Sequence, residues 1–266
     1  MLSAVKYLGP VGMGVTSPQL FLADDHCVYI VKLQNNRLGP KILANELLAA
    51  QIGKSLALTF PPSDIIFLDE KIIKENRRLW RTRVPVGIHF ASKYIKQNRY
   101  VSRTNLAKAG NISDMAGVVL FDHLFHNFDR TGNHKNLLLC QEQEHFRIYA
   151  IDNSHLFGKG RWDSRLLVRL MDRIVINKQR TYGTLLKYFL KPEHFSKYVK
   201  SMRTLDDGYW NDLVGSIPEE WLPLPSEREV LLRFLLRRRD MVDKIAERIF
   251  SLIPDKNRSA DMNQSI

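Results

Sequence analysis

Two aspartates in the middle of the chain stand in surroundings that suit phosphoryl transfer from a nucleotide. Asp129 belongs to a polar segment, residues 128–136, that leads into a short apolar run, and Asp152 follows a second apolar run, residues 146–151. This chemistry needs one aspartate to orient the attacking hydroxyl, and an asparagine with a second aspartate to hold magnesium. A charged loop between two strands has a similar composition, so these residues alone leave both interpretations open.

Three further features precede these aspartates, in an order that suits the same chemistry. Residues 9–18 contain three glycines and two prolines, and the backbone amides of such a turn can approach a phosphate closely. Lys32 ends a run of branched and aromatic residues that predicts a strand over residues 27–33. Glu46 follows in a predicted helix over residues 40–54. A strand lysine that pairs with a helix glutamate holds the inner phosphates of ATP in kinases.

Each of these features has a plainer explanation when it is taken singly. Lys32 suits an edge strand, Glu46 suits an exposed helix surface, and a segment with glycine and proline is usually only a turn. The turn also departs from the spacing G-x-G-x-x-G. The full order of glycine loop, lysine, glutamate, aspartate, asparagine and aspartate is difficult to obtain by chance, so it favours a nucleotide site. The candidate phosphate-binding residues are Gly12, Gly14, Thr16, Ser17 and Lys32.

Five short segments are similar to those of a known family. They are Val31–Lys32, Asn45–Ala50, Asn127–Thr131, Asn136–Leu138 and Ile151–Asp152. Through them the chain resembles the HipA-like kinases, in particular the short stand-alone HipA-like domain proteins of bacteria. The resemblance covers roughly the first 160 residues and continues beyond them only as a compatible helical pattern. It implies a two-lobed kinase fold that uses ATP and Mg²⁺ and is distantly related to the phosphatidylinositol-kinase-like group.

The resemblance also implies a role for each candidate residue. Lys32 would contact the phosphates, and Glu46 would orient that lysine. Asp129 would be the catalytic aspartate. Asn136 and Asp152 would hold the magnesium ion.

The spacing of the asparagines departs from the usual kinase pattern. In many kinases the metal-binding asparagine follows the catalytic aspartate by five residues, whereas Asn133 follows Asp129 by four and Asn136 follows it by seven. We favour Asn136, because it leads directly into the apolar strand, and Asn133 is the alternative metal ligand. The signatures His-Arg-Asp and Asp-Phe-Gly of eukaryotic protein kinases are absent from the sequence.

The length of the chain agrees with an enzyme of this kind. A chain of 266 residues is near the upper limit for a single core, so two lobes around a cleft are expected. The resemblance implies an α+β, bilobal fold of the protein-kinase-like (HipA/phosphatidylinositol-kinase-like) type, and the length agrees with it. A small β-rich N-lobe would span residues 1–95, a larger and mainly helical C-lobe residues 96–254, and a flexible C-terminal tail residues 255–266.

Composition bears on location and partners. No apolar run approaches the roughly 18 residues of a membrane span, and the N-terminus lacks a signal-peptide pattern. Cys27 and Cys140 lie in apolar runs and are expected to be free thiols. These observations predict a cytoplasmic protein without a membrane partner. The net charge of +12 makes nucleic acid a conceivable partner, but 20 of the 40 basic residues lie before Arg161 and 20 from it onward. A charge spread in this way favours a solvated surface.

Hydrophobic periodicity predicts the elements between the candidate residues. Strands are expected over residues 64–68 and 87–95, and a helix that begins near Ser113 would lead into the catalytic loop. Residues 70–80 suit either a helix or a hairpin, and residues 96–110 suggest a surface connection.

The C-terminal third is predicted to be helical. Ser226 and Glu229 have the spacing of a capping box, which would open one long helix that continues to about Leu252. Its apolar stripe is typical of a helix that faces the core, and the arginines at 237–239 interrupt it.

The sequence thus predicts an ATP-dependent kinase that moves a γ-phosphoryl group to a hydroxyl. By resemblance, that hydroxyl belongs to a serine or threonine of a protein. Three alternatives stay open: a small-molecule kinase, a pseudokinase that acts as an interaction module, and a polyanion-binding protein in which the kinase-like residues are incidental.

Overall fold

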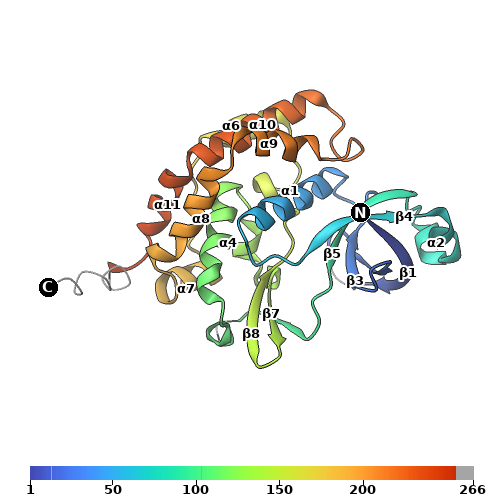
Figure 1. The fold of residues 1–266 in the computed structure, drawn as a ribbon, viewed down its shortest axis with the longest axis horizontal. Helices are drawn as coiled ribbons and strands as arrows, with labels where there is room; N and C mark the ends of the chain where they lie inside the picture. The colour runs from blue at the N-terminus through green and yellow to red at the C-terminus, as the bar shows by residue number, and fades with distance from the viewer. Residues whose placement is uncertain (13, 103, 256–266) are drawn as a thin grey trace.

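A five-stranded barrel forms the N-terminal part of the molecule (Figure 1). The computed structural model of the protein describes residues 1–12, 14–102 and 104–255. The barrel strands are β1 (Leu2–Pro10), β2 (Gln19–Ala23), β3 (Val28–Lys32), β4 (Ser63–Leu68) and β5 (Gly87–Lys93). They pair in the order β1-β2-β3-β5-β4, and a parallel pairing of β1 with β4 closes the barrel.

Successive side chains of strand β3 point alternately into the barrel core and into a cleft. Tyr29 and Val31 of β3 lie in the barrel core together with Ala91 of β5. Ile30 and Lys32 line a cleft between the barrel and the rest of the molecule. Successive side chains of a strand point to opposite faces, so the apolar run that predicts β3 also places Lys32 on the cleft side.

Strands β1 and β2, which flank the glycine-rich turn, were not expected from the sequence. Their pairing changes register twice, between Ala4 and Lys6 and between Tyr7 and Gly9. Each irregularity interrupts the alternation of apolar and polar residues by which a strand is recognised. The predicted turn itself lies between the two strands.

Residues 70–80, for which helix and hairpin both remained open, lie in two short helices. These are α2 (Glu70–Glu75) and α3 (Arg77–Arg81). The Asp69 carboxylate accepts a hydrogen bond at 2.8 Å from the backbone amide of Ile72, as an N-cap aspartate does. Ile72 then packs into the barrel core.

Helix α1 (Lys41–Ser55) lies between the barrel and the helical part of the molecule (Figure 1). It confirms the helix predicted over residues 40–54. Ten of its 15 residues are buried, so it has hardly any polar face. Leu47 and Leu48 belong to the larger hydrophobic cluster, which includes the helical lobe, and not to the barrel core. Helix α1 therefore packs in the larger cluster while it also contacts β4 and β5 of the barrel, and the predicted lobe boundary at residue 95 stays a prediction.

A small sheet and a group of helices make up the rest of the described chain (Figure 1). The sheet has the strands β6 (Asn98–Tyr100), β7 (Leu137–Glu142) and β8 (His145–Ala150), in that order. The helices are α4 (Met115–Leu124), α5 (Asp129–Gly132), α6 (Ser164–Met171), α7 (Arg180–Tyr188), α8 (Pro192–Thr204), α9 (Asp207–Gly215), α10 (Pro225–Asp240) and α11 (Val242–Phe250). Short 3₁₀ turns are η1 (Leu106–Lys108), η2 (Ile112–Asp114), η3 (His134–Asn136) and η4 (Leu156–Gly158).

Three expectations for this region were wrong. Residues 96–110 are not only a surface connection, because β6 pairs with β7 there. The capping box at Ser226 does not form. Helix α10 begins at Pro225, whose fixed φ suits the first helical position. The N-cap residue is Leu224, which makes no side-chain hydrogen bond to the helix. The single long helix breaks at Met241, where φ and ψ are −92° and 2°.

One member of the arginine cluster at 237–239 is a structural residue. The Arg238 side chain is fully buried and donates hydrogen bonds to the carbonyls of His123 and Leu124, at 3.0 and 2.7 Å. These carbonyls end α4 and have no partner within the helix, so a cation there satisfies them and suits the helix dipole. The end of α4, from which the chain enters the candidate catalytic loop, is thereby held in place.

Other expectations can be compared directly with the described residues. Cys27 and Cys140 are free thiols, as predicted. Within the described parts of the chain, no helix has both the length and the apolar character needed to cross a membrane. Of the predicted tail over residues 255–266, only Asp255 is described.

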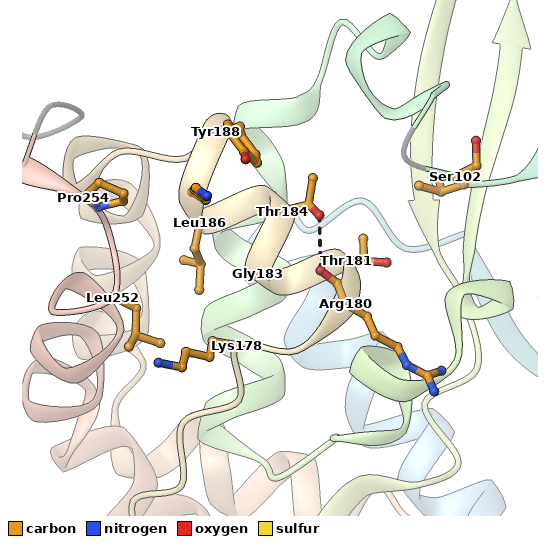
Figure 2. Close-up of a pocket in the computed structure, with 12 residues that line it drawn as sticks. Ser102, Lys178, Arg180, Thr181, Gly183, Thr184, Leu186, Tyr188, Leu252 and Pro254 are labelled. Atoms are coloured by element: carbon orange, nitrogen blue, oxygen red, sulfur yellow. Dashed lines mark hydrogen bonds between the residues drawn. The ribbon is translucent and has the colours of Figure 1, made fainter.

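Two hollows of the surface bear on function. The cleft between the barrel and the small sheet has a volume of about 550 Å³. A cavity of about 860 Å³ lies against α7 on the helical lobe (Figure 2).

Candidate active site

A group of three charged side chains joins the barrel to the helical lobe. Lys32 at the end of β3 donates a hydrogen bond to a carboxylate oxygen of Glu46 on α1. Its ammonium also donates to Oδ1 of Asp152 at 2.7 Å. Lys32 and Glu46 are buried, whereas the Asp152 side chain is 34% exposed toward solvent. The structure thus brings together three predicted residues from three separate segments.

Lys32 and Asp152 hold each other in their charged forms, whereas burial raises the pKa of the Glu46 carboxyl group. Burial by itself would lower the pKa of the Lys32 ammonium, but the carboxylates of Asp152 and Glu46 outweigh it and raise that pKa above its usual value. Burial would raise the pKa of Asp152, yet the attraction of Lys32 and a hydrogen bond from Ser154 hold it below its usual range. Because Asp152 is partly exposed, solvent screens part of the attraction that lowers its pKa. Lys32 is therefore a cation and Asp152 an anion at neutral pH.

The segment after β8 is shaped around Asp152. Asp152 adopts a left-handed backbone conformation, with φ of 61°, which aspartate tolerates better than most residues. The hydroxyl and the backbone amide of Ser154 donate to its Oδ1. The backbone amide of Asn153 donates to Oε1 of Glu46 at 3.0 Å. The predicted strand end therefore places Asp152 beside the helix that carries Glu46.

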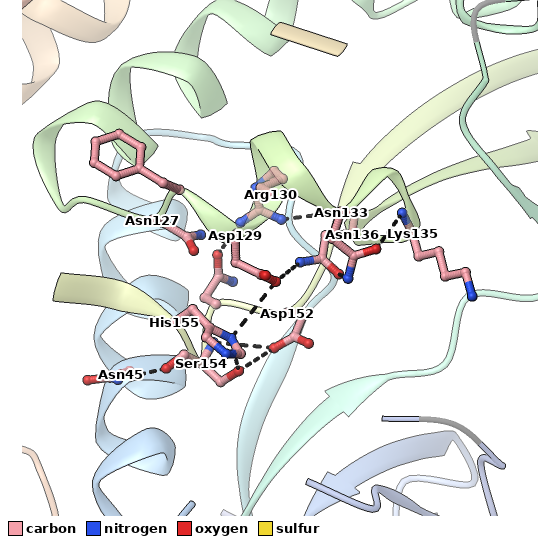
Figure 3. Close-up of polar contacts among 12 residues, drawn as sticks. Asn45, Asn127, Asp129, Arg130, Asn133, Lys135, Asn136, Asp152, Ser154 and His155 are labelled. Atoms are coloured by element: carbon pink, nitrogen blue, oxygen red, sulfur yellow. Dashed lines mark hydrogen bonds and ion pairs between the residues drawn. The ribbon is translucent and has the colours of Figure 1, made fainter. Parts of the chain in front are cut away.

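Asp129 begins α5, shortly after the end of α4. Nδ2 of Asn136 donates to Oδ2 of Asp129 at 2.6 Å, and Nδ2 of Asn133 donates to Oδ1 of Asn136 at 3.1 Å (Figure 3). The Asp129 side chain is 33% exposed, so a substrate hydroxyl can reach it. Both candidate asparagines thus lie next to the candidate catalytic carboxylate.

The contacts of the two asparagines favour Asn136 as the metal ligand. Its backbone carbonyl accepts a hydrogen bond at 2.9 Å from the amide of Ile151, the residue before Asp152. Asn136 therefore contacts both the Asp129 loop and the Asp152 segment. The Asn133 side chain instead bonds Asn136 and the backbone of Lys135. The oxygen of Asn136 still has a second lone pair available for a ligand.

The cleft beside these groups has the shape and lining of a nucleotide site. Lys32, Glu46, Asn133, Asn136 and Asp152 all line it. Its volume of about 550 Å³ lies in the range of roughly 300–1,000 Å³ that is usual for small-molecule sites. Its lining also includes the apolar residues Ile30, Pro61, Phe90, Ile95, Leu138 and Ile151.

The glycine-rich turn contributes only part of its predicted residues to this cleft. Gly14 and Thr16 line the cleft, whereas Gly12 and Ser17 are exposed and lie outside its lining. Gly14 has φ of +121°, a conformation that residues with a Cβ avoid. The turn is therefore placed over the cleft, with Gly14 and Thr16 as its nearest predicted residues.

A buried arginine, Arg130, connects the two halves of the site, and sequence analysis did not identify it. Its guanidinium donates to Asp122 on α4 at 2.8 Å and to the backbone carbonyl of Asn136 at 3.1 Å. It also donates to the carbonyl of Ile151 and to the side chain of Asn153. Arg130 and Asp122 are fully buried. The planar fork of arginine suits such a junction, because its donors have fixed directions.

Helix α1 is fastened to the helical lobe by a second buried network. Nδ2 of Asn45 donates to the carbonyls of Ser154 and Gly160, each at 2.9 Å. Its Oδ1 accepts a hydrogen bond from Trp162 Nε1 at 2.8 Å. At the start of the helix, Lys41 forms an ion pair of 2.7 Å with Glu227. The helix that carries Glu46 is thus fixed against the segment that carries Asp152.

Replacement of Asn45 by alanine is expected to lower the free energy of unfolding by about 2–3 kcal/mol, because it leaves Trp162 and two carbonyls without partners. Thermal unfolding followed by circular dichroism should show a midpoint lower by roughly 5–10 °C. Asn211→Ala on the exposed face of α9 is the matched control and should change the midpoint of thermal unfolding little. An equal midpoint for both variants would contradict the role of this network.

His155 is a further residue at the site that sequence analysis did not identify. Its Nδ1 lies 3.9 Å from Oδ2 of Asp129 and 3.2 Å from the hydroxyl of Ser154 (Figure 3). Its closeness to Asp152 in the sequence was the one signal that pointed to it. The imidazole therefore stands beside the candidate catalytic carboxylate.

The donor atoms suit a magnesium ion that is shared with substrate phosphates. Magnesium prefers oxygen ligands and is usually bound by one or two carboxylates together with phosphates. Asp152 supplies a carboxylate and Asn136 an amide oxygen. The described residues contain no group of three or more His, Cys, Asp or Glu side chains that could hold a metal. A two-residue site completed by a nucleotide fits these observations.

A barrel with a Lys–Glu pair, joined across a cleft to a helical lobe that carries aspartate and asparagine, defines a phosphotransferase of the protein-kinase-like class. Residues 5–250 match the family model described as HipA-like kinase. The chain therefore belongs to the HipA-like kinase family, as the resemblance in the sequence predicted. No curated protein matches the sequence significantly.

Solved structures of kinases have the same fold. The structure of a Helicobacter pylori proinflammatory kinase, CtkA, is similar with a TM-score of 0.57 and 13% identity, over 92% of this chain and 94% of that one. The Golgi casein kinase with Mn/ADP bound is similar with a TM-score of 0.51 and 10% identity, over 97% and 75%. Fam20 of hydra with sugar has a TM-score of 0.53 and 13% identity, over 97% and 88%. These likenesses confirm a kinase-like fold.

Proposed function

We propose that the protein is an ATP- and magnesium-dependent kinase that transfers the γ-phosphoryl group to a serine or threonine hydroxyl of a protein. The observation that carries this proposal is the convergence of Lys32, Glu46, Asp152 and Asn136 around one cleft, with Asp129 hydrogen-bonded to Asn136. Membership of the HipA-like kinase family supports it. The bound Mn/ADP of the Golgi casein kinase supports the use of a nucleotide and a divalent metal.

Each residue has a part in the proposed reaction. Lys32, oriented by Glu46, neutralises charge on the inner phosphates of the nucleotide. Asp129 orients the acceptor hydroxyl and accepts its proton as the oxygen attacks phosphorus. Asn136 and Asp152 hold the magnesium ion, which supplies positive charge next to the transferring group.

The glycine-rich turn and the apolar part of the cleft complete the proposed nucleotide site. The backbone amide of Gly14 and the hydroxyl of Thr16 lie on the phosphate side in this proposal, whereas Gly12 and Ser17 lie outside the lining of the cleft. The base lies among apolar side chains that include Ile30. A cytoplasmic location, where ATP is available, is part of the proposal.

A phosphotransfer assay tests the proposal directly. The protein is incubated with γ-labelled ATP, magnesium and either a mixed serine/threonine peptide library or a set of hydroxylated small molecules. Label in peptides supports a protein kinase, and label only in small molecules supports a small-molecule kinase. Binding of ATP without transfer to any acceptor, including the protein itself, would instead favour a pseudokinase.

Replacement of Asp152 by alanine is expected to remove the magnesium dependence of ATP binding, because the carboxylate is the only acidic ligand in the proposed metal site. Loss of an outer-shell partner of a ligand typically weakens metal affinity by about 10–100-fold, so loss of the ligand itself should weaken it at least as much. Calorimetric titration with ATP, with and without Mg²⁺, measures this difference. Asp212→Ala, an exposed carboxylate of α9, is the control and should keep the wild-type dependence. An unchanged magnesium effect in Asp152→Ala would refute the assignment.

A further inference from the structure

A second hollow, distinct from the nucleotide cleft, lies against α7 and holds about 860 Å³ (Figure 2). Its size falls within the range of roughly 300–1,000 Å³ that is usual for ligand sites. None of its lining residues lines the nucleotide cleft, which is formed on the barrel side of the small sheet. The cavity is therefore a separate candidate site on the helical lobe.

Two residues that line this cavity are hydrogen-bonded to residues in or next to the catalytic loop. Arg180, which begins α7, donates a hydrogen bond to the backbone carbonyl of Gly132 at the end of α5. On the other side, the amide of Val101 donates at 3.0 Å to the carbonyl of Leu137, the residue after Asn136. The cavity is thus adjacent to the loop that starts at Asp129 through these two bonds, although none of residues 129–136 is in its described lining.

The lining combines positive charge with an apolar surface. Lys178, Arg180 and Lys187 carry the charge, and all three side chains are exposed. In Figure 2, Lys178 extends toward Leu252, whereas Arg180 extends to the opposite side. The apolar lining residues are Val101, Leu186, Leu252 and Pro254, and the hydroxyl-bearing ones are Ser102, Thr181, Thr184 and Tyr188. The described lining contains no aspartate or glutamate.

This combination fits an acidic protein segment better than a nucleic acid. Single-stranded nucleic acids are bound by a basic groove together with aromatic side chains on which bases stack. Tyr188 is the one aromatic residue in the described lining. Nucleic acid has no aliphatic side chain to cover the half-buried Leu252 and Pro254, whereas a peptide can place one there and keep its carboxylates near the lysines.

We propose that this cavity docks the protein substrate, and that it accepts a segment in which acidic residues flank an apolar side chain. The proposal rests on the proposed kinase function, whose acceptor it specifies. Carboxylates of the segment pair with Lys178 and Lys187, and its apolar side chain covers the aliphatic lining. Docking there raises the local concentration of a nearby serine or threonine hydroxyl at the catalytic loop.

The test uses the full-length protein and a variant with Lys178→Glu and Lys187→Glu. Arg180 is left unchanged, because it bonds the catalytic loop. The control variant, Lys71→Glu with Arg77→Glu, makes the same change of net charge on exposed positions of α2 and α3. Fluorescence anisotropy measures binding of three labelled probes: a peptide of alternating glutamate and leucine, a peptide of alternating lysine and leucine, and an oligouridine of equal charge to the first.

The expected result is that the wild type and the control variant bind the acidic peptide, and that the double lysine variant binds it at least about tenfold more weakly. Binding should also weaken as salt is raised from about 50 to 300 mM, because the charges are exposed. An equal loss in the control variant, or tighter binding of oligouridine than of the peptide, would overturn the proposal.

Measurements of peptide binding and of phosphotransfer distinguish a failure of the docking proposal from a failure of the kinase proposal. Peptide binding that depends on the two lysines, without any phosphotransfer, would keep the docking site and reject the kinase function. Phosphorylation of serine peptides with a KM that is the same for acidic and neutral sequences would keep the kinase function and reject the docking site. For a correct docking site, the double lysine variant raises KM for an acidic serine peptide at least about tenfold, while kcat changes little.

Discussion

Replacement of Asp129 by asparagine is expected to lower kcat for phosphotransfer by about 10²–10⁴-fold, the usual contribution of a positioned general base. Asparagine keeps an oxygen that can accept the hydrogen bond from Asn136, so the variant removes the negative charge with little change of shape. ATP affinity should stay within about twofold, because Asp129 is not among the residues that line the nucleotide cleft. Single-turnover rates and calorimetric ATP titration measure the two quantities.

The control for this experiment is Asp212→Asn, which makes the same substitution on the exposed surface of α9. It should leave both the rate and the affinity unchanged. A normal rate for Asp129→Asn would remove Asp129 from the reaction, and His155, 3.9 Å away, would become the next base to test. Loss of ATP binding together with rate would instead mean that Asp129 shapes the cleft.

The arrangement of the charged candidates follows from local patterns in the sequence. The apolar run before Lys32 predicts a strand, and alternation along that strand settles which face carries the lysine. Glu46 lies on a helix of the predicted length, and Asp152 follows a predicted strand. Each local pattern fixes one side chain relative to its own element, and the known requirement for a Lys–Glu pair then connects two of the elements.

The buried polar contacts of Asn45 and Arg130 could not be predicted from the sequence. Asn45 in an apolar helix gives no local sign that it bonds residues 109 and 115 positions away. Arg130 and Asp122 belong to types that are almost never fully buried without a partner, so their burial depends on finding each other in three dimensions. Such contacts depend on tertiary packing, which periodicity and composition do not encode.

Packing shows how α1 connects the two parts of the molecule, which the sequence did not indicate. Its position before residue 95 assigns it to the N-lobe, and its length and start were predicted well. Its leucines nevertheless pack in the larger cluster, and Asn45 and Lys41 fasten it to the helical lobe. The Lys32–Glu46 pair is therefore assembled by the same contacts that hold α1 against the helical lobe.

Replacement of Arg130 by methionine is expected to lower the free energy of unfolding by about 3–5 kcal/mol, because it leaves the buried Asp122 carboxylate without its cation. Methionine fills a similar length, so the loss comes mainly from charge and hydrogen bonds. The urea midpoint of unfolding, followed by circular dichroism, measures the change. Phosphotransfer should fall as well, since Arg130 holds the carbonyls of Asn136 and Ile151.

A second substitution, Asp122→Asn, separates the two effects of Arg130. In the double variant the unpaired buried charge is gone, so most of the lost stability should return, as it does when both partners of a buried ion pair are made neutral. Activity should stay at least about tenfold below that of the wild type, because the side chain that bonds the carbonyls of both Asn136 and Ile151 is then missing. Full activity in a stable double variant would show that Arg130 supports only the fold. Low activity with restored stability would show that it positions the two proposed metal ligands.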